Sequence, residues 1–387
     1  MRCDSFPVSC GPEGAAQDAA RRIFAERGFP DKSVESWRYA KPFLTAPAHI
    51  LAYASVSRPR ISASRCDVYD AACLPEGLLP AFLPLFVSEA PDARFPLTRE
   101  NAFFMAEEGD ATAVWVKAGE SARLSLEYHD ANEGASRRRL YVVAEEGASL
   151  TLTEKFSAAH GTCATSLAHI VLKKGATCRH YAVQNVSNKA YALQRVEVVA
   201  QENASYNAFR LHAGGLAHKC DMIVRLEGER ARADELVIAT AGKGEYRDVY
   251  MPVYHHARNA HSAQTVRQAP MDEGTCVYYG AAYVPPEGAG AKASQLNRNV
   301  LLGKKAKALG RPELHILTDD VRCSHGSATG SLDEAALYYL QSRGIERADA
   351  LWMMLEAFLT PDAGALSDVA MREEVARIVR ERFCSGE

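Results

Sequence analysis

Two residues that can bind a metal, or act as a nucleophile with its base, stand close together near the end of the sequence. Cys323 and His325 are two apart in the stretch DDVRCSHGSATG, Asp319 to Gly330. In an extended segment, residues two apart point to the same side, so the thiol and the imidazole would share a face. No third ligand, orienting residue or oxyanion hole is evident nearby. The residues alone leave three interpretations open: two metal ligands, a catalytic pair, or a buried structural pair.

A second cluster contains His255, His256 and His261 in the stretch YHHARNAHSAQTVR. Neighbouring residues of a strand project to opposite faces, so at most one of the first two joins His261. An isolated cluster of this kind is more often hydrogen-bonded structure than a metal site. We therefore predict a structural role for these histidines.

The composition argues against several classes of protein. The chain has 387 residues with 47% hydrophobic and 24% charged residues and a net charge of −3, without the basic excess of a general nucleic-acid binder. Charges interrupt every apolar stretch before the ~20 residues needed to span a membrane, and the opening lacks the pattern of a secretion signal. The ten cysteines form no Cys-x-x-Cys pair, which argues against a zinc ribbon or a self-contained ferredoxin-like site. In a large chain without an export signal, we interpret them as reduced cytosolic thiols. We expect a cytoplasmic protein that binds neither nucleic acid nor membrane.

Nucleotide-binding motifs are also missing from the sequence. The glycine-containing segments AGGLAHK and TAGKGEY fit neither a phosphate-binding loop nor a dinucleotide fingerprint. We expect no nucleotide on this chain.

The middle of the chain contains a repeat of 28 residues. Each repeat has a turn residue that tolerates a left-handed conformation, flanked by alternating apolar residues. The repeats begin at Val114, Val142, Ile170 and Val198, and their turn residues are Gly119, Gly147, Gly175 and Asn203. Alternation with period two predicts strands with one buried face, and equal units of this kind bury a core by stacking as a solenoid. The pattern loosens after Leu226, although short strands continue to about residue 322.

The region before the repeat is predicted to be helical and rich in proline. EGAAQDAARRIFAERG predicts a helix that ends at Gly28, and LPEGLLPAFLPLF has too many prolines for a long helix. The cluster ESWRYAKPF is interpreted as a surface loop pinned by Trp37 and Tyr39.

The region after the repeat predicts three helices. The first begins at a capping box formed by Ser331 and Glu334 and ends at Gly344. The second runs through ADALWMMLEAFL to Pro361, and the third covers SDVAMREEVARIVRERF. The sequence thus predicts a mainly β protein with residues 1–95 as a helical and Pro-rich region, 96–325 as a solenoid core and 326–387 as a helical domain.

The stretch from Asp319 to Leu359 closely resembles the C-terminal signature of SufD-type members of the SufB/SufD family. The pattern Asp-Asp-Val-basic-Cys-Ser-His-Gly, followed by Asp-Glu and Tyr-Leu-x-Ser-Arg-Gly-Ile, is long and specific. The segments ESWRY, LTRENAFF, HSAQTVR, VYYG and LNRNVLL follow the family order. SufB-like chains carry Glu-His-Glu-Ala in place of Cys323 to Gly326, and a sulfur-accepting cysteine near Arg298 to Leu302. The resemblance is therefore to the SufD type, which is not expected to accept sulfur in that way.

The resemblance implies a right-handed parallel β-helix and a role as a non-catalytic scaffold subunit for iron–sulfur cluster assembly. It implies pairing with SufB through the β-helix, docking of the SufC ATPase on the C-terminal helices, and an indirect link to a cysteine desulfurase system. His325, and more weakly Cys323, would hold a transient iron or iron–sulfur cluster shared with SufB. A flavin in the complex has no readable signature here. The expected docking residues are Ser331, Leu332, Leu337, Tyr338, Leu340, Arg343, Leu355 and Phe358.

Two alternatives belong to other classes. One is a β-helix enzyme acting on carbohydrate or acyl groups through the histidine cluster, which would need charged residues repeated along one face of the solenoid. The other is a self-sufficient iron-binding protein that uses Cys323, His325 and a remote ligand.

Overall fold

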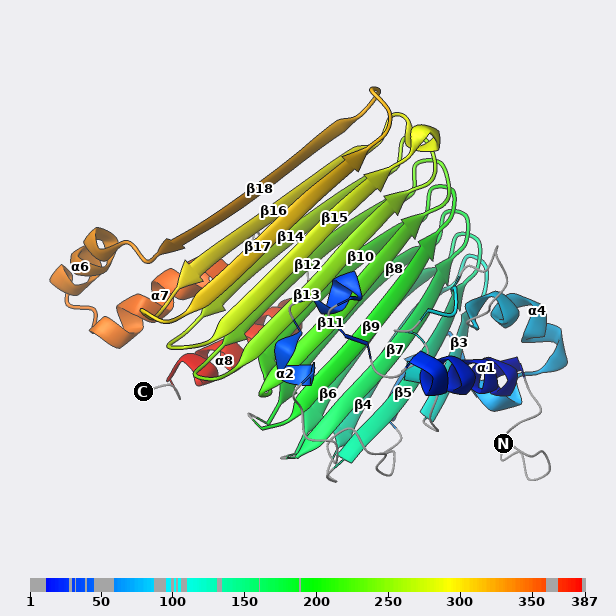
Figure 1. Ribbon diagram of the computed structural model, residues 1–387, viewed down its shortest axis with the longest axis horizontal. Helices are drawn as coiled ribbons and strands as arrows, with labels where there is room; N and C mark the ends of the chain where they lie inside the picture. Colours follow the sequence, from blue (N-terminus) through cyan, green and yellow to red (C-terminus); the bar gives the residue numbers. More distant parts are fainter. Residues whose placement is uncertain are drawn as a thin grey trace.

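The protein is a solenoid built from two facing sheets of nine strands each, shown in Figure 1. The structure is a computed structural model that describes residues 12–27, 30–31, 33–38, 40–44, 59–86, 95–98, 101, 104–105, 110–130, 134–159, 161–187, 189–359 and 368–384. Strands β4 to β18 with even numbers form one sheet together with β1, and strands β3 to β17 with odd numbers form the other together with β2. We call these the even sheet and the odd sheet, and the space between them the lumen.

Successive strands alternate between the two sheets, so the chain winds through about 8 turns. This confirms the predicted mainly β solenoid with helices at both ends. The strands are β1(Arg60–Ser64), β2(Asp67–Asp70), β3(Asp110–Val116), β4(Ser121–Asp130), β5(Gly134–Ala144), β6(Ser149–Ala158), β7(Thr162–Leu172), β8(Thr177–Val186), β9(Tyr191–Ala200), β10(Ser205–Gly214), β11(Ala217–Leu226), β12(Arg232–Ala241), β13(Tyr246–His255), β14(His261–Pro270), β15(Thr275–Val284), β16(Lys292–Leu301), β17(Lys307–Ile316) and β18(Arg322–Ser331). The helices are α1(Pro12–Arg27), η1(Glu35–Trp37), α2(Lys41–Leu44), η2(Ala71–Cys73), η3(Glu76–Leu78), α4(Leu79–Phe82), η4(Leu83–Leu85), η5(Pro286–Gly288), α6(Glu334–Ser342), α7(Arg347–Leu359) and α8(Val369–Cys384).

The register of the strands confirms the 28-residue repeat. The four first residues of the repeats are stacked in one column, since Val114, Val142, Ile170 and Val198 are consecutive partners in the odd sheet. The predicted turn residues all have a left-handed backbone, with φ angles of 71° at Gly119, 68° at Gly147, 67° at Gly175 and 56° at Asn203. Repeated apolar columns and repeated turns thus set the pitch of the solenoid.

The coils continue past Leu226 although the sequence repeat weakens there. Arg230 and Asn259 adopt the same left-handed turn without being glycine, each with φ of 59°. The turn amides form a column of hydrogen bonds, in which Asn203 donates to the carbonyl of Glu229 and Arg230 to that of Arg258. Backbone pairing to the next coil therefore maintains the turn where the sequence pattern has been lost.

The N-terminal region covers the first coil and the outer face of the odd sheet. Within the predicted helical and Pro-rich region, β1 and β2 pair antiparallel with β4 and β3, which the sequence analysis did not anticipate. These two strands occupy the edges of the first coil. The segment ESW forms η1 instead of a surface loop, because Trp37 is buried beneath the cover with Lys219 5.6 Å from its ring centroid. Tyr39 and Gly28 lie outside the described residues.

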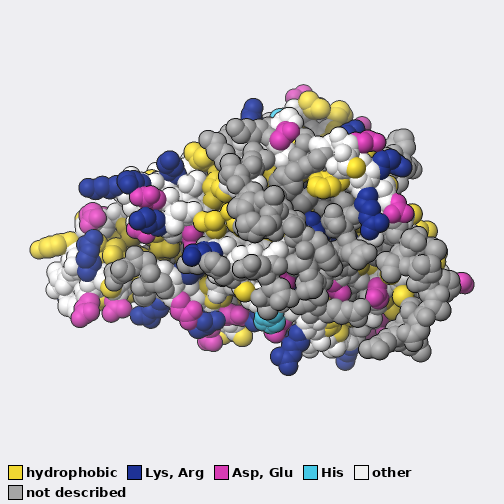
Figure 2. Space-filling model, turned by 60° about the horizontal axis from the view of Figure 1, so that its bottom comes forward, with side chains coloured by type: hydrophobic (Ala, Val, Ile, Leu, Met, Phe, Trp, Pro, Cys, Tyr) yellow, Lys and Arg dark blue, Asp and Glu magenta, His cyan; other side chains and the backbone are white. Residues whose placement is uncertain are grey.

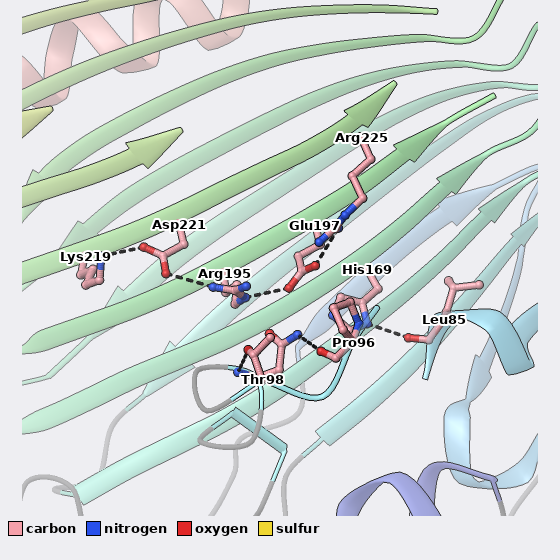
Figure 3. A network of polar contacts seen from close by, with 10 residues as sticks. Leu85, Pro96, Thr98, His169, Arg195, Glu197, Lys219, Asp221 and Arg225 are labelled. Carbon is pink, nitrogen blue, oxygen red and sulfur yellow. Dashed lines mark hydrogen bonds and ion pairs between the residues drawn. The ribbon is translucent and has the colours of Figure 1, made fainter. Parts of the chain in front are cut away.

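A chain of buried ion pairs lies under this cover on the outer face of the odd sheet (Figure 3). Lys219 contacts Asp221 at 2.6 Å, and Asp221 contacts Arg195 at 3.1 Å. Glu197 then joins Arg195 at 2.8 Å to Arg225 at 2.9 Å. Burial alone would raise the pKa of Glu197, but the two flanking guanidinium groups hold it below its ordinary value.

The C-terminal helices form the opposite end of the molecule. Helices α7 and α8 pack on the outer face of the even sheet, where Trp352, Leu355 and Ile378 join a cluster with Phe209 and Leu211 of β10. Helix α6 begins after Asp333, whose carboxylate accepts a hydrogen bond from the Ala335 amide at 2.9 Å. The predicted capping box is therefore wrong, because the residue at 331 is the last of β18.

Loss of the central carboxylate of the ion-pair chain should destabilise the fold. Glu197→Gln leaves the guanidinium groups of the buried Arg195 and the partly buried Arg225 without their shared anion, and we expect the free energy of unfolding to fall by about 3 kcal/mol. The control Glu202→Gln removes a half-exposed partner of Lys174 and should cost less than about 0.5 kcal/mol. Urea unfolding of both variants measures the difference, and equal losses would contradict the role given to Glu197.

Candidate functional site

The last coil of the solenoid is open. Strand β18 pairs with β16 and strand β17 pairs with β15, and within the described residues neither has a neighbour on its other side. Both strands are largely exposed, in contrast to the strands of the middle coils. The unpaired amide and carbonyl groups of such an edge favour the addition of another strand.

Cys323 and His325 lie on this open strand and share one face, as their spacing predicts. Their partners in the register of β16 are Ala293 and Gln295, which are both buried and face the lumen. The two candidate side chains therefore belong to the lumen side of the last coil. Cys323 is half-buried, and burial raises the pKa of its thiol despite a hydrogen bond from the backbone of Ala293. His325 is exposed.

Side-chain hydrogen bonds between β16 and β18 fix the strand that carries this pair. Ser327 donates to Asn297 at 3.0 Å, and Asn299 donates to Thr329 at 2.9 Å. The two asparagines also bond to each other at 3.0 and 2.9 Å. On β17, a Cβ at Gly310 would lie 2.5 Å from the amide oxygen of Asn297, so this position requires glycine. The inner face of the last coil is thus held in a fixed register.

A ladder of buried amides continues from the position beside His325 into the lumen. Gln295 donates to Gln264 at 3.1 Å, and Gln264 donates to the carboxylate of Glu235 at 3.3 Å. Burial raises the pKa of Glu235 to about 7, although the hydrogen bond from Gln264 and the nearby Arg210 lower it. The polar column links the open end to a carboxyl group two coils deeper.

Sequence reasoning missed the residues of this ladder. In SQLNRNVL, Gln295, Asn297 and Asn299 alternate with Leu296 and an arginine. Hydrophobic alternation places the leucine inside, but the structure exposes Leu296 and buries the amides. The signal that could have found them is the period-two spacing of the amides themselves.

The histidine cluster does not converge on a common point. His255 is buried in the lumen and bonded to Ser262 at 2.9 Å, and burial lowers its pKa to about 4. His256 is exposed, and His261 lies 3.6 Å from Asp234. The hydrogen bond of His255 fits the structural role predicted for it, and the role of the other two histidines stays a prediction.

The expected docking residues differ in exposure. Tyr338 is 75% exposed on α6, and Ser331 and Arg343 are exposed beside it. Leu332, Leu340 and Phe358 are half-buried, whereas Leu337 and Leu355 are buried within the chain. Tyr339 and Met353 are also exposed, which the sequence analysis did not single out. Figure 2 shows hydrophobic and charged side chains interspersed over this narrow end of the molecule.

No three His, Cys, Asp or Glu side chains in the described ranges are arranged to hold a metal ion. No helix in the same part of the chain has the length and apolar character needed to cross a membrane.

Comparison with known proteins identifies the family. The family model for the SUF system FeS cluster assembly SufBD core domain matches residues 127–358, which include the last three of the four repeats, the open edge and part of the C-terminal helices. The chain belongs to the SufB/SufD family. The predicted family is thereby confirmed.

Curated relatives include both types of the family. The chain is 28% identical over 245 residues to the iron–sulfur cluster assembly protein SufD of Escherichia coli K12, covering 62% of this chain and 57% of the relative. It is 30% identical over 234 residues to SufB of Bacillus subtilis 168, covering 59% and 50%. A SufBD family protein of Synechocystis matches with 24% identity over 266 residues, covering 64% and 58%. The matches thus span little more than half the length of these relatives.

Glu235 should make stability depend on pH. Its pKa rises from 4.5 to about 7 on folding, so between these values the folded protein holds the proton more tightly than the unfolded chain. The group therefore favours the folded state fully below pH 4.5, and this contribution is lost as the pH rises through 7. Relative to wild type, we expect Glu235→Gln to gain about 2 to 3 kcal/mol of stability between pH 5 and pH 8. Urea unfolding at both pH values tests this, and a difference independent of pH would contradict it.

Proposed function

We propose that this chain is a SufD-type, non-catalytic scaffold subunit that pairs with SufB to form a site for nascent iron–sulfur clusters. The observation that carries the proposal is the open last coil, whose lumen face presents Cys323 and His325. Family membership supports a role in iron–sulfur cluster assembly, and the open edge is where a partner strand would pair.

Pairing with a second solenoid follows from the geometry of the edge. A strand that pairs with β18 must continue the spacing of about 4.8 Å between neighbouring strands, which the terminal coil of another solenoid provides. SufB is the partner proposed here because SufB and SufD types both occur among the relatives of the chain. The SufD type is assigned to this chain because Cys323 to Gly326 stand where SufB-like chains carry Glu-His-Glu-Ala.

The chemistry proposed for the interface is that of a shared ligand set. The exposed imidazole of His325 is a good ligand for iron, and thiolates of the partner would supply the softer donors that a cluster needs. Cys323 is the weaker candidate, because burial favours its neutral thiol, whereas the thiolate is the form that binds metal. Sulfur would reach the site through SufB from a cysteine desulfurase system, and this chain would carry no nucleotide. We place this activity in the cytoplasm.

Helix α6 and its surroundings form the proposed docking surface for the SufC ATPase. The helix lies beyond the end of β18 and exposes Tyr338 and Tyr339, with the guanidinium of Arg343 bonded to the second tyrosine at 3.2 Å. Exposed aromatic and arginine side chains are enriched among the residues that dominate protein interfaces. Leu337 and Leu355 would support this surface from beneath.

Co-expression with SufB and SufC tests the proposal as a whole. We expect a stable complex that contains all three proteins, and a chain that fails to join it would overturn the proposal. Iron and sulfide analysis of the chain purified alone tests the self-sufficient alternative. A stoichiometric cluster in the lone chain would contradict the shared site.

Replacement of the candidate ligand should impair cluster formation without affecting assembly. In His325→Ala we expect complex formation as in wild type and a yield of reconstituted cluster lower by about tenfold, a typical effect of disturbing a metal site. The matched control is His256→Ala, which removes an exposed histidine from a turn after β13. Visible absorbance and sulfide content report the yield. A full yield in the His325 variant would show that the imidazole is not a ligand.

Replacement of the most exposed aromatic residue should weaken ATPase binding. For Tyr338→Ser we expect SufC affinity to fall by about tenfold or more, as for an interface anchor. Leu83→Ser, which changes an exposed residue at the other end of the solenoid, serves as control. Calorimetric titration with SufC measures both, and unchanged affinity of the tyrosine variant would exclude this docking surface.

A further inference from the structure

The amide ladder in the lumen has a direction. The Nε2 group of Gln264 donates both to Oε2 of Glu235 at 3.3 Å and to the carbonyl of Met251 at 2.7 Å. The carbonyl can only accept, so the amide must turn its NH2 group toward it and its oxygen toward β16. That oxygen accepts from Gln295 at 3.1 Å and from the Tyr278 hydroxyl at 3.4 Å. Every amide of the ladder therefore points its donor toward Glu235 and its acceptor toward the open end.

The ladder ends in an acceptor with no donor. The Oε1 atom of Gln295 is buried and has no hydrogen-bond partner within the described residues. The next position in the register is His325, on the same face of the adjacent strand at a spacing of about 4.8 Å. Ser327 and Thr329, further along β18, already bond to Asn297 and Asn299, so the strand is fixed while the imidazole is exposed.

We infer that Gln295 is a positioning residue for His325, accepting the ring N–H so that the other ring nitrogen presents its lone pair at the open end. A neutral imidazole has one donor and one acceptor nitrogen, and the bond made by one of them sets which is free to bind a metal. Because the ladder offers an oxygen at this point, an imidazole that bonds to it acts as the donor. The use of the lone pair for iron rests on the proposed function, whereas the hydrogen bond does not.

The inference is tested by the tautomer of His325 in the isolated full-length chain. Ring-¹⁵N histidine labelling and long-range ¹H–¹⁵N spectra at pH 8.5 distinguish the two neutral forms, and His325→Ala identifies the signal among the 12 histidines. In wild type we expect one tautomer to exceed the other by about tenfold, the upper range for one hydrogen bond. Gln295→Leu should reduce this excess toward the ratio of a free imidazole.

Two further variants control the test. Gln295→Glu retains an acceptor oxygen at this position, so it should keep the tautomeric excess. Gln268→Leu removes another buried glutamine from the lumen, on β14 and outside the ladder, and should leave the His325 signal as in wild type. Thermal unfolding shows whether Gln295→Leu folds. If it does not, the tautomeric excess in Gln295→Glu is the test, and a mixture there contradicts the inference.

Three results would overturn the inference: a tautomer mixture in wild type, an undiminished excess in Gln295→Leu, or a mixture in Gln295→Glu. The cluster assay on His325→Ala separates this inference from the proposed function. A fixed tautomer in wild type, together with full cluster yield in His325→Ala, would refute the metal role and leave the positioning by Gln295 in place. A mixture of tautomers in wild type, together with a low cluster yield in His325→Ala, would refute the positioning by Gln295 and leave the metal role in place.

Discussion

Backbone pairing between successive coils is the interaction on which this structure depends. Each strand of the middle coils satisfies its amide and carbonyl groups through the coil before it and the coil after it. The column of left-handed turns keeps this pairing in step, even where arginine or asparagine replaces glycine. A stack of this kind necessarily has two ends, and each end must be covered or remain available.

The two ends of this solenoid are treated differently. At the first coil, β1 and β2 pair antiparallel with their neighbours, and the N-terminal region packs apolar side chains on the odd sheet. At the last coil, β17 and β18 have no described neighbour on their outer side, and the C-terminal helices cover the outer face of the even sheet rather than the edge. The lumen changes accordingly, from apolar side chains such as Leu124 and Leu152 to the amides of Gln295 and Asn297. A polar lumen at the open end keeps the register of β18 through specific hydrogen bonds, where few apolar contacts remain to hold it.

The sequence predicts the parts of the fold that repeat or alternate. The valine columns and turn glycines give the solenoid, Gly344 ends α6 with φ of 83°, and the spacing of Cys323 and His325 gives their common face. It does not predict parts that depend on tertiary pairing. Strand β1 is exposed along its whole length, so the alternation of Ile61 and Ala63 with polar residues corresponds to no buried face. Strand β18 extends to Ser331 because that residue pairs with Leu301, which displaces the expected helix cap. The lumen amides are not predicted because the buried face of β16 is polar, whereas the buried face of a strand is usually apolar.

Hydrogen–deuterium exchange of β18 tests the central claim most directly. In the chain alone, the backbone amides of residues 322–331 that face away from β16 should exchange rapidly, since nothing in the described structure pairs with them. After addition of SufB these amides should become strongly protected, while those of β1 at the opposite end of the solenoid remain unchanged. A complex with SufB in which β18 exchanges as fast as in the lone chain would contradict the proposal that the open coil is the place of assembly.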